Sequence, residues 1–245
     1  MLENTFIHLP KFGEKKERAL WENGVKNWND YIDNFSNSQD HIEHCAIIHA
    51  SREALANKNA EYFGNTLPRR EAWRAFPYFN KIAYLDIETT GISKHRDYTT
   101  VIGLFDGSKT HSYVHGKNLD QFVEDIKEYE MVVTFNGSLF DIPFIRRDIP
   151  QAKVPSLHVD TRFLLSSLGV RGGLKKIEAQ FGLEREDDLK GMNGYDAVIL
   201  WKKYKKNNDL EALDKLVRYN AADVENLKTL LEWGYKEKRK NIKLD

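Results

Sequence analysis

The sequence has little of several things that would mark an exported or membrane protein. It contains one cysteine, Cys45, among 245 residues. A single cysteine excludes an internal disulfide and fits a reducing compartment, so we expect a cytoplasmic location. No apolar run approaches the roughly 20 residues that a membrane-spanning helix needs. The first residues also lack the charged-then-apolar order of a secretory signal. We therefore expect no membrane partner.

The chain also lacks net charge, because 37 Lys and Arg residues balance 37 Asp and Glu residues. This balance gives no overall basic field that would indicate nucleic acid. It does not argue against nucleic acid either, since an acidic metal site would offset basic patches elsewhere. The hydrophobic share of 41% is typical of one globular domain, with or without a smaller appendage.

Residues 1–79 predict a small helical region at the N-terminus. Pro10 and Gly13 indicate a turn that leads into an amphipathic helix. The pattern resembles a degenerate helix-hairpin-helix unit, a module that presents backbone amides to a phosphate, with Lys11 where the family has glycine. The resemblance makes Lys11 and Lys15 candidate nucleic-acid contacts. The alternative is a hairpin that only packs against the main domain.

A further helix is predicted from His41 to Phe63, ending before the breaker run 64–68. Arg69 and Arg70 then interleave with aromatic residues. Basic and aromatic side chains together can bind single strands by charge and stacking, so both arginines are candidate nucleic-acid contacts. The alternative is that the aromatics belong to the core and the arginines are solvated. We place a domain boundary here, with residues 80–245 as the second domain.

The second domain has the pattern of an α/β protein. The hairpin signal Asp106-Gly107 joins two strand-like runs. A continuous apolar run further along is typical of a buried parallel strand. The predicted strands are Lys81–Asp86, Thr99–Asp106, Thr110–Val114 and Met131–Phe135, with a helix over Leu119–Tyr129 before the last of them. This order predicts a mixed sheet, an antiparallel meander plus parallel strands, flanked by helices.

Two carboxylates stand at the end of the first strand. Side chains alternate faces along a strand, so Asp86 and Glu88 share a face while Ile87 points into the core. Like charges this close repel unless a cation lies between them. The alternative interpretation is an acidic turn leaving the core. After the buried strand, Gly137 permits a sharp turn and Ser138 is a candidate N-cap for a helix that carries Asp141.

The last long helix is predicted to start after Asp209 as N-cap and to run past Leu231. Tyr219 and Asp223 lie four residues apart in it, which places both on the same face. Earlier in the chain, His158 and Asp160 flank Val159, and Asp160 is interpreted as another N-cap.

Together these groups resemble the DEDD exonucleases of the ribonuclease H-like superfamily, which include DnaQ-like enzymes. Asp86-Ile87-Glu88, Asn136 with Asp141, and Tyr219 with Asp223 match the three family motifs in order. The histidine branch carries His five residues before the last Asp, and here that residue is Arg218, which indicates the tyrosine branch. Pro68, Glu71 and Trp73 before the first motif, together with the hairpin-like start, resemble the YprB-like group most closely.

The resemblance implies two divalent cations, Mg²⁺ or Mn²⁺, held by hard oxygen ligands. Asp86 would bridge both ions, Glu88 and Asp223 would complete the water-activating ion, and Asp141 would support the second. Tyr219 would orient the attacking water, since a phenol with its usual pKa of about 10 is a weak base. Residues expected to contact the terminal nucleotide are Thr89, Thr90, Gly91 and Asn136.

The function expected from this resemblance is metal-dependent 3′→5′ exonucleolysis at single-stranded ends of DNA or RNA. Two alternatives stay open: a structure-specific endonuclease on the same fold, and a non-catalytic adaptor that binds nucleic acid. The choice between DNA and RNA, the pathway, the oligomeric state and a helicase or repair partner do not follow from the sequence.

Overall fold

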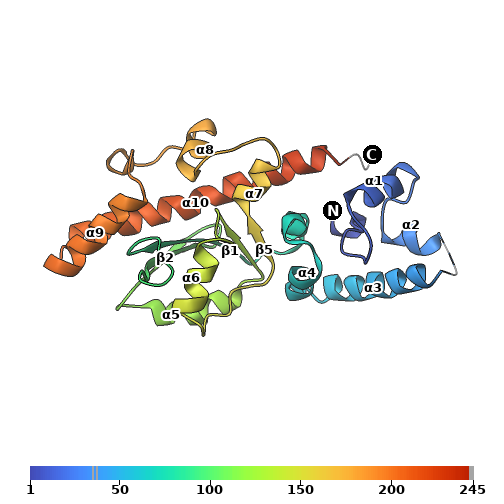
Figure 1. The fold of residues 1–245 in the computed structure, drawn as a ribbon, viewed down its shortest axis with the longest axis horizontal. Helices are drawn as coiled ribbons and strands as arrows, with labels where there is room; N and C mark the ends of the chain where they lie inside the picture. Colours follow the sequence, from blue (N-terminus) through green and yellow to red (C-terminus); the bar gives the residue numbers. More distant parts are fainter. Residues whose placement is uncertain (35, 37, 243–245) are drawn as a thin grey trace.

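The centre of the molecule is a mixed five-stranded sheet flanked by helices (Figure 1). The computed structural model describes residues 1–34, 36 and 38–242. The strands run in the order β3-β2-β1-β4-β5. Their bounds are β1 (Ile82–Thr89), β2 (Thr99–Phe105), β3 (Thr110–Val114), β4 (Met131–Thr134) and β5 (His158–Asp160). β1, β2 and β3 pair antiparallel, whereas β4 is parallel to β1 and to β5. The predicted α/β mixed sheet is confirmed.

Helices connect and cover the strands. After β3 the chain forms α5 (Leu119–Asp125), η3 (Ile126–Glu128), α6 (Asp141–Asp148), α7 (Thr161–Ser166), α8 (Leu174–Gln180), η4 (Asp187–Leu189), α9 (Gly194–Asn207) and α10 (Leu210–Lys240). Asp209 caps α10 by accepting a hydrogen bond of 2.9 Å from the Ala212 amide, as predicted.

The two faces of β1 pack against different helices. Ala83, Leu85 and Ile87 lie in one core cluster with Phe122 of α5 and Phe144 of α6. The residues between them face α10, so Ile82 and Tyr84 lie in a second cluster with Leu227 and Leu231 of that helix. Because alternation continues along the strand, Asp86 and Glu88 also face α10.

The elements before β1 are all helical: η1 (Leu2–Asn4), α1 (Glu14–Glu22), α2 (Trp28–Asp33), α3 (Gln39–Ala56), α4 (Ala60–Thr66) and η2 (Arg69–Tyr78). The prediction of one helix over 41–63 is wrong, because the chain turns between α3 and α4. Lys58 there has a left-handed φ of 53°, and Asn59 caps α4 by accepting a hydrogen bond from the Tyr62 amide. The cap gives α4 a start of its own.

A buried ion-pair cluster ties α1 to η2. Arg74 lies between Glu17 and Glu71, with nitrogen–oxygen distances of 2.9 and 2.7 Å, and all three side chains are buried. Thr5 donates to Glu17 at 2.8 Å and accepts from Arg74 at 2.9 Å. The neighbouring aromatic residue Trp73 is also buried, so it belongs to the core and not to a stacking surface.

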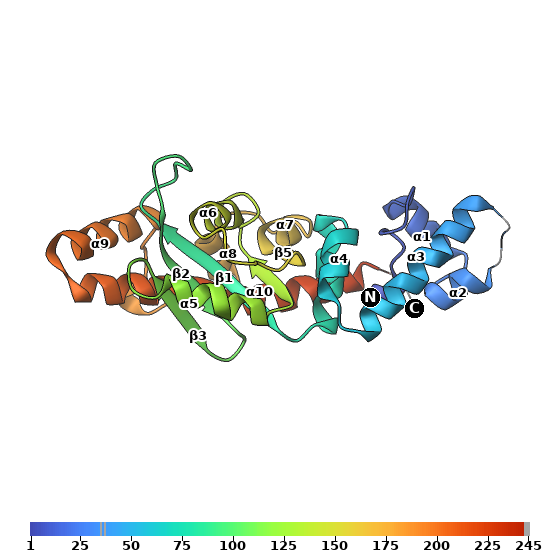
Figure 2. The same cartoon turned by 90° about the horizontal axis from the view of Figure 1, so that it is seen from below.

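The helix α10 runs along the molecule, from α9 across the sheet to the region of α1 (Figures 1 and 2). Its apolar stripe therefore serves several partners: Leu216 packs with α9, Leu227 with the sheet and Leu230 with α7 and α8. Within the described residues, no helix is long and apolar enough to cross a membrane.

Candidate metal centre

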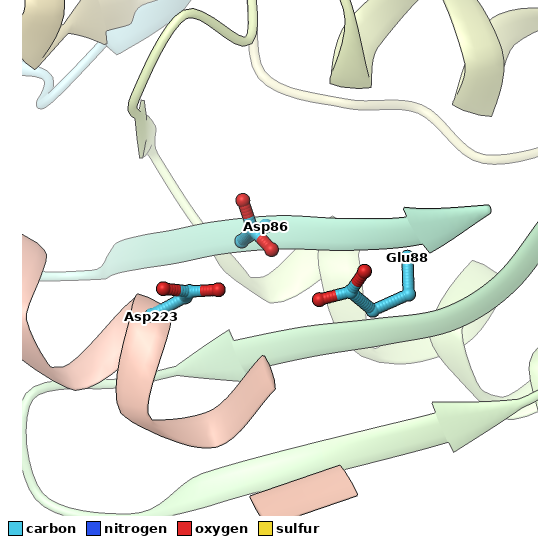
Figure 3. Close-up of side chains that lie close together, drawn as sticks. All are labelled: Asp86, Glu88 and Asp223. Atoms are coloured by element: carbon cyan, nitrogen blue, oxygen red, sulfur yellow. The ribbon is translucent and has the colours of Figure 1, made fainter. Parts of the chain in front are cut away.

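Three carboxylates converge between β1 and α10 (Figure 3). Asp86 and Glu88 come from β1, and Asp223 comes from the facing side of α10. One oxygen of each carboxylate lies within 4.8 Å of the other two. Glu88 and Asp223 are buried, and Asp86 is half-buried. The structure thus brings together residues that are 137 positions apart in the chain.

The fourth predicted carboxylate, Asp141, lies beside this cluster at the amino end of α6. Its Oδ1 accepts a hydrogen bond of 3.0 Å from the backbone amide of Ile87, the residue between Asp86 and Glu88. Asp141 is 2% exposed. It is placed there because β4 is the parallel neighbour of β1, so both carboxyl ends reach the same edge of the sheet.

The turn from β4 to α6 differs from the prediction in two respects. Ser138 is not the N-cap of α6; that position is Phe140, whose side chain makes no cap hydrogen bond. The left-handed residue is Asn136, with a φ of 65°. Gly137 instead allows the turn to pack closely against the Thr134 side chain, since a Cβ at residue 137 would lie 2.3 Å from Thr134 Oγ1.

Asp160 explains why Ser138 is not free to cap α6. Its carboxylate accepts hydrogen bonds from the Asn136 amide at 2.8 Å and from the Ser138 hydroxyl at 2.5 Å. It also caps α7 through the Arg162 amide, as predicted. One side chain at the end of β5 therefore fixes the turn that delivers Asp141.

Asn220 was not predicted as a site residue, although it holds Asp86 in place. Its Nδ2 donates to Asp86 Oδ2 at 2.9 Å and to the Asp86 carbonyl at 3.3 Å. Asn220 fits against β2 because residue 103 is glycine: a Cβ there would lie 2.3 Å from Asn220 Oδ1. The signal in the sequence was its position three residues before Asp223, on the same helix face.

Tyr219 lies one helical turn before Asp223 and is 3% exposed. Its hydroxyl accepts a hydrogen bond from the ammonium of Lys175 on α8. Burial and the nearby carboxylates raise the pKa of Tyr219 above its usual value. The phenol is therefore protonated at neutral pH and can act as a hydrogen-bond donor.

Arg185, between α8 and η4, supplies a cation to the cluster. Its guanidinium pairs with Asp223 and, at 2.7 Å, with Glu178. Glu178 accepts a further hydrogen bond of 2.9 Å from Asn226 of α10. Arg185 was not predicted, because it comes from a loop whose sequence carries no motif. Its Nη1 is buried and has no hydrogen-bond partner among the described residues.

The carboxylates hold protons more tightly than free carboxylates do. Burial raises the pKa of Asp86 and Glu88, and repulsion from the neighbouring carboxylates adds to the effect. Burial raises the pKa of Asp141 to about 7. Burial also raises the pKa of Asp223, although Arg185 opposes the change. A bound cation would offset both the burial and the repulsion.

The donor set fits a hard divalent cation. Asp86, Glu88 and Asp223 offer only oxygen ligands, and their spacing lets one ion touch all three. Arg185 engages Oδ1 of Asp223, so an ion there would use the other oxygen or displace the guanidinium. The charge of Asp141 helps to raise the pKa of Asp86, so the two carboxylates lie close together. A second cation beside both would offset their repulsion.

The residues predicted to contact the terminal nucleotide lie at the carboxyl ends of β1 and β4. Thr89 Oγ1 donates to the Gly91 carbonyl at 2.6 Å, and Thr90 Oγ1 donates to Asp97 at 3.1 Å. Asn136 Oδ1 accepts from Arg162 at 2.5 Å. All four therefore lie at the same edge of the sheet as the carboxylates, with polar groups that already have partners within the chain.

The predicted nucleic-acid contacts of the N-terminal region come from the helical part of the chain before β1, not from the sheet that carries Asp86 and Glu88. Lys11 has a left-handed φ of 61° and pairs with Asp40 at 2.8 Å. Arg70 pairs with Glu14 at 3.3 Å. Lys15 and Arg69 are exposed. Their role in binding stays a prediction.

The family model of the RNase H superfamily matches residues 83–235, more than half of the chain. The chain belongs to the RNase H superfamily. The matched region begins in β1 and ends in α10, so it includes every residue of the carboxylate cluster. No match to the curated proteins was found.

Several solved structures match this chain at low sequence identity. The family B DNA polymerase of the hyperthermophilic archaeon Pyrobaculum calidifontis is 18% identical with a TM-score of 0.49, covering 62% of this chain and 24% of the polymerase chain. Brucella melitensis NrnC with bound Mg²⁺ is 17% identical with a TM-score of 0.46, covering 73% and 82% of the two chains. The Aedes aegypti Nibbler EXO domain is 15% identical with a TM-score of 0.40, covering 68% and 82%. The match to the polymerase thus spans about a quarter of that chain.

Proposed function

We propose that this protein is a metal-dependent 3′→5′ exonuclease that hydrolyses phosphodiester bonds at single-stranded ends of DNA or RNA. The observation that carries the proposal is the cluster of Asp86, Glu88 and Asp223 on the α10 face of an RNase H superfamily sheet. Asp141 and Tyr219 border the same cluster. Within that superfamily we assign the chain to the tyrosine branch of the DEDD exonucleases, nearest the YprB-like group.

Each residue has a role that its position supports. Asp86, Glu88 and Asp223 would hold one divalent ion, Mg²⁺ or Mn²⁺, and Asp86 with Asp141 would hold a second. Such ions lower the pKa of bound water and neutralise charge at the leaving oxygen. Tyr219 donates a hydrogen bond that orients the attacking water. Asn220 keeps Asp86 in its binding orientation.

The proposal is tested in the presence of Mn²⁺ with 5′-labelled single-stranded DNA and RNA, with the same strands blocked at the 3′ end, and with internally labelled circles. We expect stepwise shortening from the 3′ end and no cleavage of circles or 3′-blocked strands. Cleavage of circles would instead favour the structure-specific endonuclease. Binding of the strands without any cleavage would favour the non-catalytic adaptor.

A further inference from the structure

A lysine from α8 reaches the tyrosine of the candidate site. The Lys175 ammonium donates a hydrogen bond to the Tyr219 hydroxyl and lies 4.4 Å from the centre of its ring. Lys175 is half-buried. Among the described residues, it forms no ion pair with a carboxylate, so its close polar partner is the phenol oxygen.

Two later residues of α8, Ile177 and Glu178, hold the helix that carries Lys175. Ile177 is 1% exposed and packs with Leu165 of α7 and Leu230 of α10. Glu178, three residues after Lys175 and on the same side of the helix, is held by Arg185 and by Asn226 of α10. The short helix α8 is therefore anchored to α10 by an apolar contact and by a polar one. The Lys175 side chain extends from this anchored helix to Tyr219.

The contact determines which way the Tyr219 hydroxyl donates. An ammonium group has only donors, so the phenol oxygen must accept the hydrogen bond from Lys175. The single phenol proton is then directed to another acceptor. The charged groups that act most strongly on Tyr219 are Asp223, Glu88 and Asp86. Because Lys175 is the donor in this contact, the phenol proton of Tyr219 is available to an acceptor such as the attacking water.

We propose that Lys175 is a positioning residue for Tyr219, which it holds with the hydroxyl proton directed toward the attacking water. This inference rests on the proposed exonuclease function. The charge of Lys175 also acts on Glu88 and Asp223, whereas Arg185 pairs directly with Asp223 and Glu178, so neutralisation of the carboxylates does not rest on Lys175 alone. The role of Lys175 is therefore expected to depend on the hydroxyl of Tyr219.

A double-mutant cycle between Lys175→Met and Tyr219→Phe tests this dependence. The maximal rate and the KM on a 3′-labelled single strand would be measured with Mn²⁺, and Mn²⁺ binding would be measured separately by calorimetry. We expect Lys175→Met to lower the maximal rate on the order of 10- to 100-fold with little change in KM or Mn²⁺ affinity. In the Tyr219→Phe background, the same change should lower the rate less than about twofold.

Two further variants control for other effects. Lys175→Arg keeps a cationic donor and should recover most of the rate, whereas Lys176→Met removes the adjacent exposed lysine and should match wild type. Circular dichroism of each variant establishes that it folds. If Lys175→Met does not fold, Lys175→Gln is used in its place. The inference about Lys175 would be overturned if Lys175→Met lowered the maximal rate equally in the wild-type and Tyr219→Phe backgrounds, or if it changed only KM. Either result would leave the proposed nuclease function standing. Complete inactivity of the wild type on every end would overturn the proposed function and this inference with it.

Discussion

At the scale of single residues, Asn220 determines where the Asp86 carboxylate lies. The amide is fully buried and donates to both the side chain and the backbone of Asp86. Its placement depends on Gly103, which leaves room for it on β2. Removing a residue that orients a metal ligand in this way typically lowers metal affinity about 10- to 100-fold.

We therefore expect Asn220→Ala to weaken Mn²⁺ binding about tenfold and to lower nuclease activity by at least a similar factor. Asp86 would no longer be held toward Glu88 and Asp223. Calorimetric titration with Mn²⁺ measures the affinity, and Asn207→Ala, at an exposed position on α9, is the matched control. An affinity equal to that of wild type would show that Asn220 does not orient Asp86.

At the scale of elements, the segment from α8 to η4 delivers cations to the carboxylates on β1 and α10. The Arg218 side chain on α10 fixes this segment through ion pairs with Glu186 and, at 2.8 Å, with Asp188. Arg185 is thereby kept against Asp223. Arg218 thus connects α10 to the segment that carries Arg185.

Arg185→Met is expected to lower the free energy of unfolding of the metal-free protein by roughly 3–5 kcal/mol, since Glu178 and Asp223 would stay buried without an ion-pair partner. Mn²⁺ should then raise the melting temperature more in the variant than in wild type, because the ion no longer competes with a guanidinium for Asp223. Thermal unfolding with and without Mn²⁺ measures both effects. Arg171→Met, at an exposed position, is the control. An equal Mn²⁺-induced shift in Arg185→Met and wild type would contradict this competition.

The sequence was sufficient to predict the elements whose patterns are local. Alternation and the Asp106-Gly107 turn predicted the meander of β1, β2 and β3, and the apolar run predicted β4. The break between α3 and α4 could not be predicted, because it depends on a lysine in a left-handed conformation that most residues avoid. Ser138 was misread as a cap because its partner, Asp160, is distant in the sequence.

The same distinction applies to the candidate site. The motif residues Asp86, Glu88 and Asp223 meet as expected, because strand alternation and the position of α10 determine where they point. Lys175 and Arg185 were missed, since only tertiary packing of α8 and the following loop brings them to the carboxylates. The division of the chain near residue 79 stays a prediction.

At the scale of the whole molecule, one hydrophobic core joins the N-terminal helices to the sheet. Phe6 and Trp28 belong to the same buried cluster as Tyr84 of β1 and Leu231 of α10. His8 lies within this region, hydrogen-bonded to Ser51 at 3.1 Å. Unfolding of either part would expose apolar surface of the other, so we expect both to unfold in one transition.

His8 should make this transition sensitive to acid. Burial lowers the pKa of His8 from about 6.5 to about 4, so the unfolded chain binds a proton more tightly than the folded one. Stability that is present above pH 6.5 is then lost as the pH falls toward 4. In urea unfolding at about pH 7 and about pH 5, His8→Gln should lose less stability than wild type, by on the order of 1–2 kcal/mol. An identical loss in both proteins would exclude His8 as the cause.

The central claim is that the carboxylates between β1 and α10 form a metal-dependent nuclease site. The most direct measurement is the degradation of 5′-labelled single-stranded DNA and RNA with Mn²⁺ by wild type and by Asp86→Asn. Asp86→Asn keeps the side-chain shape but removes the charge of the carboxylate that lies beside both Glu88 and Asp223. The account predicts shortening from the 3′ end by wild type and none by a folded Asp86→Asn. Equal degradation by the two proteins would contradict it.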